Sequence, residues 1–190
     1  AGFGLAQAWV LGSGVPVDDE VQVANIREAA SQNCALVIDA GALELIDYSS
    51  LAPESCILTP HAGELARLLD RFGKHLDLDY EAVVAAAAIT NQVVMLKGNM
   101  TLIADPNGEV RAVGPNSTAL ATAGTGDVLA GIVGSLLATN SVGEQNLLDV
   151  AELAVLIHSE AATRAAESGP VAALDVAEQV RTVVRDWMPA

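Results

Sequence analysis

The chain has 190 residues, of which 52% are hydrophobic and only 3% aromatic, and its formal net charge is −15. This length suits one domain, expected to span residues 1–190, with a core of Ala, Val, Leu and Ile. So acidic a chain is unsuited to nucleic acid or to an anionic membrane surface, and it has no run of about 18 apolar residues that would cross a membrane.

We expect the protein to lie in the cytoplasm, because the start of the sequence shows no charged segment followed by an apolar one, which is the pattern of a secretory signal. Cys34 and Cys56 lie beside apolar runs without metal-ligand spacing, so we interpret both as free thiols. A small anionic ligand is compatible with the charge if backbone dipoles and a few cations surround it.

Four short apolar runs are predicted to be β-strands: residues 8–12 (AWVLG), 35–39 (ALVID), 55–59 (SCILT) and 93–97 (VVMLK). Patterns typical of helices separate them, at residues 18–32, 63–72 and 79–92. This alternation predicts an α/β fold in which the strands form a parallel sheet.

The rest of the chain is predicted to be a β-hairpin followed by helices. Residues 101–113 (TLIADPNGEVRAV) place two strand-like runs around a DPNG turn. Helices are predicted from Thr125 onward, at residues 148–167 and at residues 174–188. Gly131 and Gly134 inside the first of these helices each cost about 1 kcal/mol relative to Ala. We therefore expect another element to approach the helix closely there.

A glycine-rich stretch at residues 120–131 (LATAGTGDVLAG) leads into the helix that starts at Thr125. Unpaired N–H groups at a helix start attract anions, and Gly124 and Gly126 would let a phosphate approach the backbone. Asp127 beside such an anion hole could accept a proton from a hydroxyl that reacts with a phosphoryl group. Alternatively, Asp127 only favours the helix dipole and the glycines serve turn geometry; spacing alone leaves both interpretations open.

Polar residues also follow two predicted strands, at the sheet edge where parallel α/β folds bind ligands. His61 follows Pro60 and could hydrogen-bond a ligand there, or be an ordinary loop histidine. Lys97 ends an apolar strand, which favours contact with a phosphate over a place on the surface. His158 within a helix is interpreted as a core or surface residue, and His75 as part of a solvated loop.

Three motifs together resemble one enzyme family. They are LTPHAGELARLL (residues 58–69), LKGNMTLIADPNG (96–108) and LATAGTGDVLAGIVGSLLA (120–138). These motifs are similar to those of the nucleotide-dependent NAD(P)H-hydrate dehydratases, repair enzymes with a ribokinase-like fold. GSG (12–14) and IDAGAL (38–43) fit the same family in the same order. The resemblance implies a three-layer ribokinase-like fold, with a mostly parallel central sheet flanked by helices.

The same resemblance implies a lyase. Its substrates would be NADHX and NADPHX, the hydrated forms of the reduced nicotinamide cofactors, with ADP or ATP as phosphoryl donor and Mg²⁺ as the accompanying ion. A hydroxyl on the damaged ring would be phosphorylated, and phosphate would then leave to restore NAD(P)H. Asp127 would be the base that activates this hydroxyl, and no residue is assigned as a metal ligand.

The resemblance also implies two sets of binding residues. The nucleotide would contact Lys97, Gly98, Asn99, Met100, Thr101, Gly124, Thr125 and Gly126. The substrate would contact Gly14, His61 and Asp127. The chain departs from the family pattern at Ala62, where Pro is usual, and at Val15 and Pro16, where Leu and Gly are usual. Pro16 has no N–H group to donate to a ligand.

Members of the family usually carry a further N-terminal segment. We therefore expect this chain to be the C-terminal part of a longer protein, with an N-terminally truncated sheet. A sheet that lacks strands exposes an edge and an apolar face, which predicts association into a homo-oligomer. Two alternatives to an active dehydratase are a small-molecule kinase of the same fold that acts on a vitamin-precursor alcohol, and a nucleotide-binding fragment that cannot turn over.

Overall fold

The computed structural model describes residues 6–16, 18–32, 34–139 and 146–187, which contain one six-stranded sheet. The strands lie side by side in chain order: β1 (Ala8–Leu11), β2 (Ala35–Ile38), β3 (Cys56–Leu58), β4 (Val93–Leu96), β5 (Thr101–Ala104) and β6 (Val110–Val113). Strands β1 to β4 are parallel, and β5 and β6 continue the sheet as an antiparallel hairpin. The predicted parallel strands and the hairpin are therefore confirmed.

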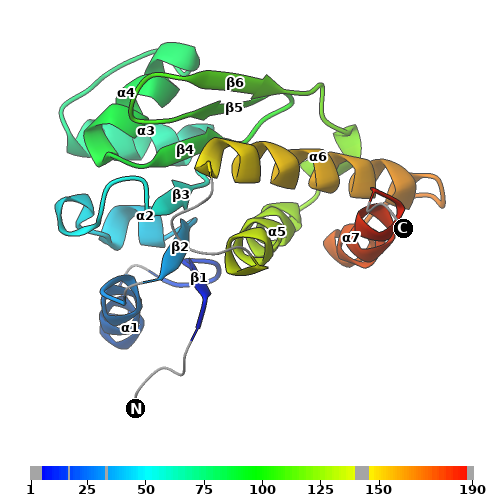
Figure 1. Ribbon diagram of the computed structural model, residues 1–190, viewed down its shortest axis with the longest axis horizontal. Helices are drawn as coiled ribbons and strands as arrows, with labels where there is room; N and C mark the ends of the chain where they lie inside the picture. The colour runs from blue at the N-terminus through cyan, green and yellow to red at the C-terminus, as the bar shows by residue number, and fades with distance from the viewer. Residues whose placement is uncertain (1–5, 17, 33, 140–145, 188–190) are drawn as a thin grey trace.

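Helices cover both faces of the sheet (Figure 1). Between the parallel strands lie α1 (Glu20–Ala30), α2 (Ala42–Leu45), the 3₁₀ turn η1 (Tyr48–Ser50), α3 (Ala62–Arg71) and α4 (Tyr80–Thr90). After the hairpin come the 3₁₀ turn η2 (Thr118–Ala121), α5 (Thr125–Thr139), α6 (Leu147–Ala166) and α7 (Ala173–Trp187). Each predicted helix is present, whereas α2, η1 and η2 are short elements that the sequence pattern did not reveal.

Alternate residues of the strands build two separate cores. Leu36 and Ile38 of β2 pack with residues of α1 to α4, whereas Val37 between them packs with residues of α5, α6 and α7. This alternation follows from the strand geometry, in which successive side chains point to opposite faces. With one core on each face, the molecule has three layers, helices, sheet and helices, as the ribokinase-like prediction requires.

Helix α5 approaches the sheet closely at Gly134. An ideal Cβ built on Gly134 would lie 2.5 Å from Cγ2 of Val10 in β1, so a side chain there would force a shift. The expected close approach is therefore confirmed at Gly134. The same prediction is wrong for Gly131, where no heavy atom lies within 4 Å of such a Cβ.

Strand β1 forms one edge of the sheet, and no strand of the described ranges pairs with its outer side. Val10 is 40% exposed at this edge. Cys34 and Cys56 are both free thiols, as predicted. Among the helices of the described ranges, none combines the length and the apolar character needed to cross a membrane.

Candidate functional site

The segments that follow β1 to β4 bring the predicted residues Gly14, His61 and Lys97, together with Asp39, to one edge of the sheet. Parallel strands end at the same edge, where open α/β sheets bind ligands. Gly14 lies beyond β1, Asp39 directly follows β2, His61 lies beyond β3, and Lys97 directly follows β4. The N–H of Lys97 donates to the carbonyl of Pro60 (2.9 Å), which joins the ends of β3 and β4.

The ammonium group of Lys97 lies between two carboxylates. Nζ is 2.7 Å from Oδ1 of Asp39 and 3.9 Å from Oε2 of Glu64. The Lys97 side chain is only 19% exposed, so it is not a solvated surface lysine. An ideal Cβ on Gly126 would lie 3.6 Å from Nζ, which places the ammonium beside the start of α5. The Lys97 ammonium therefore lies beside the positive end of the α5 dipole, with two carboxylates next to it.

Asp39 and Glu64 belong to this network, and sequence reasoning did not select them. Asp39 is 2% exposed and follows an apolar strand at the ligand-binding edge, a position that could have drawn attention to it. The Glu64 carboxylate accepts from the N–H of His61 (2.7 Å) in a capping box at the start of α3. The two carboxylates fix the place of the Lys97 ammonium.

His61 is the N-cap of α3. Its Nδ1 accepts from the N–H groups of Gly63 (3.0 Å) and Glu64 (3.3 Å), and its Nε2 lies 3.4 Å from Oε1 of Glu64. The side chain is 56% exposed. His61 is thus a helix-capping residue at the sheet edge, and its contact with a ligand stays a prediction.

Helix α5 begins at Thr125, as predicted, after a turn at Gly124. Gly124 has φ +88°, a conformation that L residues rarely adopt. Oγ1 of Thr125 lies 2.8 Å from the carbonyl oxygens of both Leu120 and Thr122, so this hydroxyl holds the turn. Asp127 is exposed on the first turn of the helix, near the positive end of the helix dipole. The N–H groups of Thr125 and Asp127 donate to the carbonyls of Thr122 (3.3 Å) and Gly124 (3.1 Å).

A cavity of about 500 Å³ lies between the β4–β5 loop and the start of α5. Six of the predicted nucleotide-binding residues line it: Lys97, Gly98, Asn99, Thr101, Thr125 and Gly126. The other predicted site residues are not in its lining: Gly14, His61, Met100, Gly124 and Asp127. Met100 is 46% exposed, and an ideal Cβ on Gly124 would lie 3.1 Å from Cβ of Ala173 in α7. The structure therefore gathers most of the predicted nucleotide residues around one hollow.

Asn116 organises the β4–β5 loop that borders this cavity. Its N–H donates to the carbonyl of Asn99 (2.7 Å), and Nδ2 donates to the carbonyl of Gly98 (2.9 Å) and to Oγ1 of Thr101 (3.0 Å). Sequence reasoning missed Asn116, because it lies beyond β6 and reaches the loop only through the antiparallel hairpin.

His158 of α6 lines the same cavity and is 5% exposed. Burial lowers its pKa to about 4; the nearby backbone of Thr125 opposes this shift, and the positive charge of Lys97 adds to it. The imidazole is therefore uncharged near neutral pH. The interpretation of His158 as a core residue is confirmed with respect to burial, yet its side chain also borders the cavity.

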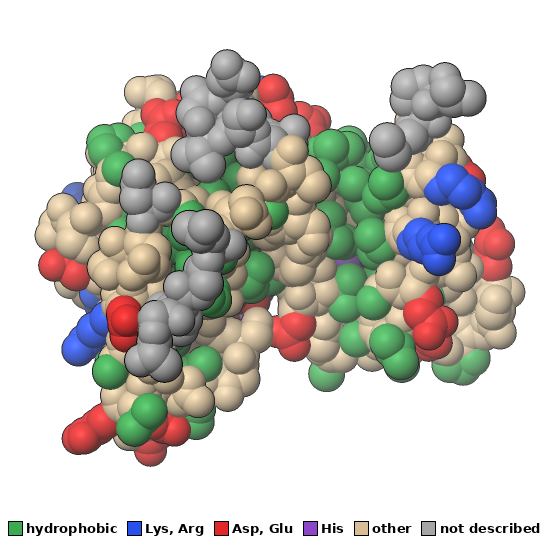
Figure 2. Space-filling model, turned by 60° about the horizontal axis from the view of Figure 1, so that its bottom comes forward, with side chains coloured by type: hydrophobic (Ala, Val, Ile, Leu, Met, Phe, Trp, Pro, Cys, Tyr) green, Lys and Arg blue, Asp and Glu red, His purple; other side chains and the backbone are tan. Residues whose placement is uncertain are grey.

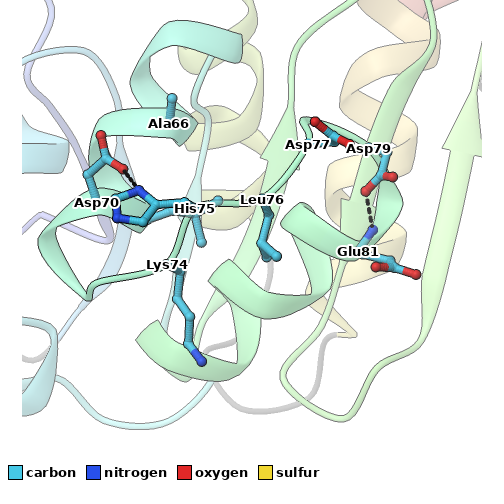
Figure 3. A pocket seen from close by; sticks show the side chains of 9 residues that line it. Ala66, Asp70, Lys74, His75, Leu76, Asp77, Asp79 and Glu81 are labelled. Carbon is cyan, nitrogen blue, oxygen red and sulfur yellow. Dashed lines mark hydrogen bonds and ion pairs between the residues drawn. The ribbon is translucent and has the colours of Figure 1, made fainter.

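A second hollow lies beside α3 and the loop that leads to α4 (Figure 3). Asp70 Oδ1 pairs with Nδ1 of His75 at 2.9 Å, and Asp79 caps α4 by accepting from the N–H of Glu81. The His75 side chain is 82% exposed, as expected for a solvated loop. Within the described ranges, no three His, Cys, Asp or Glu side chains are placed to hold a metal ion. This acidic hollow suits a phosphate far less than the cavity beside α5 does.

Residues 3–182 match the model of the family described as NAD(P)H-hydrate dehydratase. The chain belongs to the NAD(P)H-hydrate dehydratase family. The ADP-dependent (S)-NAD(P)H-hydrate dehydratase of Neisseria meningitidis serogroup B is 34% identical over 190 residues, covering 95% of this chain and 62% of that protein. The bifunctional NAD(P)H-hydrate repair enzyme of Mycobacterium tuberculosis is 38% identical over 149 residues, covering 73% of this chain and 30% of that protein. The chain thus spans less than two thirds of the length of these dehydratase relatives.

Solved structures of related proteins share the fold of this dehydratase-family chain. The ADP/ATP-dependent NAD(P)H-hydrate dehydratase of Bacillus subtilis, co-crystallized with ATP/Mg²⁺, has a TM-score of 0.74 at 27% identity, over 96% of this chain and 65% of that one. A ribokinase of Thermotoga maritima has a TM-score of 0.63 at 19% identity, over 94% of this chain and 57% of that one, which shows the fold alone. The expected ribokinase-like α/β fold is therefore confirmed.

Proposed function

We propose that the protein carrying this chain dehydrates NADHX and NADPHX to NADH and NADPH, with ADP or ATP as phosphoryl donor. The main support for this proposal is that the Lys97 ammonium and the N-terminus of α5 lie beside each other at one cavity. This cavity is large enough for part of a nucleotide. Membership of the dehydratase family supports this choice of reaction. ADP is the first donor to test, because the Neisseria relative is named as ADP-dependent.

The proposed binding roles follow from the placement of the residues around the cavity. Nucleotide phosphates would lie beside Lys97 and Gly126, at the positive end of the α5 dipole. The phosphate-facing turn would be Gly124, Thr125 and Gly126, and the AMP portion would lie along Gly98, Asn99, Met100 and Thr101. Gly14 and His61, at the same sheet edge, would border the substrate.

Asp127 would act as the base. Its carboxylate takes the proton of the substrate hydroxyl as this hydroxyl attacks the terminal phosphoryl group of the nucleotide, and AMP leaves when ADP is the donor. Breakage of the carbon–oxygen bond then releases phosphate, while a neighbouring ring carbon loses a proton, which restores the double bond of NAD(P)H. Exposure of Asp127 on the first turn of α5 supports this role.

Mg²⁺ would come with the nucleotide. This ion is commonly held by one or two carboxylates, waters and phosphate oxygens rather than by a cage of protein ligands alone. The carboxylates of Asp39 and Glu64 flank Lys97 at the sheet edge, so their oxygen chemistry fits such an ion. It would supply further positive charge to the phosphates.

The test is recovery of the reduced-nicotinamide absorbance from NADHX with Mg²⁺ and either ADP or ATP, measured on this chain and on the complete protein that carries it. Asp127→Asn should lower the rate by about a hundredfold or more, because it removes the proton acceptor. Glu20→Gln is the matched control, since it removes an exposed carboxylate from the first turn of another helix, α1.

Equal rates for Asp127→Asn and the wild type would refute the role of Asp127 as base. Phosphate transfer to a vitamin-precursor alcohol, without any recovery of NADH by the complete protein, would favour the kinase alternative. Recovery by the complete protein alone would show that this chain contains only part of the site.

We further propose that the chain self-associates and that the protein works in the cytoplasm. Strand β1 is an edge strand of the sheet within the described residues, where a further strand could be added, and hydrophobic side chains gather in a broad area on the face shown in Figure 2. Exposed hydrophobic residues include Val10 of β1 (40%) and Leu174 (68%) and Trp187 (45%) of α7. A monomer at micromolar concentration in size-exclusion chromatography would contradict self-association.

A further inference from the structure

The two ring nitrogens of His61 face different kinds of groups at the start of α3. Nδ1 accepts from the backbone N–H groups of Gly63 (3.0 Å) and Glu64 (3.3 Å). Nε2 lies 3.4 Å from the carboxylate oxygen Oε1 of Glu64. Two donors therefore face Nδ1, whereas an acceptor faces Nε2.

These contacts determine which nitrogen of His61 carries the ring proton. A backbone N–H group can only donate, so Nδ1 must offer its lone pair, and the neutral imidazole then carries its proton on Nε2. The Glu64 carboxylate, an acceptor, favours the same tautomer. His61 thus presents an N–H donor at Nε2 and has no lone pair there to take a proton from a ligand.

The Nε2–H group of His61 is held near Glu64 and is still available to a ligand. A formed N–H···O bond measures about 2.7–3.2 Å between the heavy atoms, so the distance of 3.4 Å to Oε1 is a loose contact. The His61 side chain is 56% exposed, whereas that of Glu64 is 9% exposed. A buried carboxylate is therefore placed to hold an exposed ring at the sheet edge.

Glu64 can hold this ring because its own place is fixed. Its Oε2 accepts from the backbone N–H of His61 (2.7 Å), as part of the capping box of α3, and lies 3.9 Å from Nζ of Lys97. His61 and Lys97 also form a parallel bridge between their backbones. The carboxylate of Glu64 thus lies between the His61 ring and the Lys97 ammonium.

We propose that Glu64 is a positioning residue that holds His61 as an Nε2–H donor toward an acceptor oxygen of the bound reactants. Two oxygens of the proposed reactants have this chemistry: the carboxamide oxygen of NADHX and NADPHX, and a phosphate oxygen of the nucleotide. Because His61 cannot accept a proton at Nε2, removal of the hydroxyl proton is left to Asp127. This inference rests on the proposed function, from which it takes the reactants.

The first experiment measures the tautomer of His61 without any ligand. In the ¹⁵N NMR spectrum at about pH 8.5, where an ordinary histidine is neutral, Nε2 should have the chemical shift of a protonated ring nitrogen and Nδ1 that of an unprotonated one. The His61→Ser spectrum assigns these signals by their loss. Wild-type shifts that are averages of the two tautomers would overturn the inference.

The same spectrum of Glu64→Gln tests what holds the ring. If the amide oxygen keeps the bond to the His61 N–H, the NH₂ group takes the place of Oε1 and meets the Nε2–H donor. The ring should then leave the cap, and both nitrogens should shift toward the average of the two tautomers. Unchanged shifts in Glu64→Gln would overturn the positioning role.

The second experiment distinguishes a donor to the ligand from a helix cap. His61→Ser keeps an N-cap oxygen for α3 and removes the ring donor. In the complete protein, the KM for NADHX should rise about tenfold, with little change in kcat or melting temperature. A rise in the KM for ADP instead would assign the acceptor to the nucleotide. Unchanged KM values for both reactants would overturn the inference, and His75→Ser, at an 82% exposed side chain, is the control.

The double variant tests whether Glu64 acts through His61. Gln also occupies the third position of a capping box, so α3 should still form in Glu64→Gln. This variant should raise the KM for the reactant that His61→Ser affects, and the double variant should raise it no further than His61→Ser alone, because no ring donor is left to position. Additive effects would overturn the positioning role. Glu81→Gln, at an exposed carboxylate in the first turn of α4, is the control.

Failure of the inference and failure of the proposed function give different results. Repair of NADHX by the complete protein, together with averaged shifts of the His61 nitrogens, would keep the dehydratase and overturn the inference. A fixed Nε2–H tautomer that Glu64→Gln disrupts, in a complete protein that repairs no NADHX, would uphold the positioning of His61 by Glu64 and refute the dehydratase.

Discussion

Protonation of His158 should couple the stability of the fold to pH. Burial lowers its pKa from 6.5 to about 4 in the folded chain. Between these values the unfolded chain binds a proton that the folded chain does not, so the free energy of unfolding falls as pH drops from 6.5 toward 4. Each pKa unit corresponds to about 1.4 kcal/mol, so this histidine should lower the free energy of unfolding by about 3 kcal/mol between pH 6.5 and pH 4. Above pH 6.5 it should have no effect on stability.

Urea unfolding at a series of pH values from 7 to 4 tests this prediction. Gln cannot take up the proton, so His158→Gln should lose about 3 kcal/mol less than the wild type over this range. His75→Gln, which removes an 82% exposed imidazole, should follow the wild-type curve. Parallel curves for the wild type and His158→Gln would show that the buried ring is not neutral in the folded chain.

Two further changes test the packing and the sheet edge. Gly134→Ala should destabilise the fold by about 1–3 kcal/mol, because the new Cβ would meet Val10. The matched change Gly131→Ala should stabilise the fold by about 0.5–1 kcal/mol, because its Cβ would lie in open space. Equal melting temperatures for the two variants would contradict this packing. Asp39→Asn should raise the KM for ADP, because Lys97 loses its carboxylate partner at 2.7 Å. Asp77→Asn, which changes an exposed carboxylate, is the control and should leave the KM unchanged. An unchanged KM in both variants would show that Asp39 does not position Lys97.

Local patterns were sufficient for the larger elements of the fold. Short apolar runs ended by Gly, Pro or polar residues predicted β1 to β4, and a DPNG turn predicted the β5–β6 hairpin. The start of α5 at Thr125 followed from the glycines before it. In contrast, α2 has only four residues, too few for any helical periodicity to show.

The site was only partly predictable, because its groups come from distant parts of the chain. Lys97 was selected from its place at a strand end, but its partner Asp39 is 58 residues away and is brought to it by the parallel order of the strands. Asn116 reaches Gly98 through the turn of the hairpin. Gly124 illustrates the opposite case, since it was assigned to the nucleotide and lies against Ala173 instead of in the cavity lining.

The ligands that this site can bind are determined by the groups nearest the cavity and not by the net charge of −15 of the whole chain. Asp39, Lys97 and Glu64 together carry one net negative charge when all are ionised, so side chains alone do not make the place attractive to phosphate. The attraction therefore depends on the dipole of α5, whose positive end lies beside the Lys97 ammonium in a partly buried setting that solvent screens poorly. Two carboxylates that hold this lysine in place would thus serve the proposed anion binding by fixing geometry, although their charge opposes it.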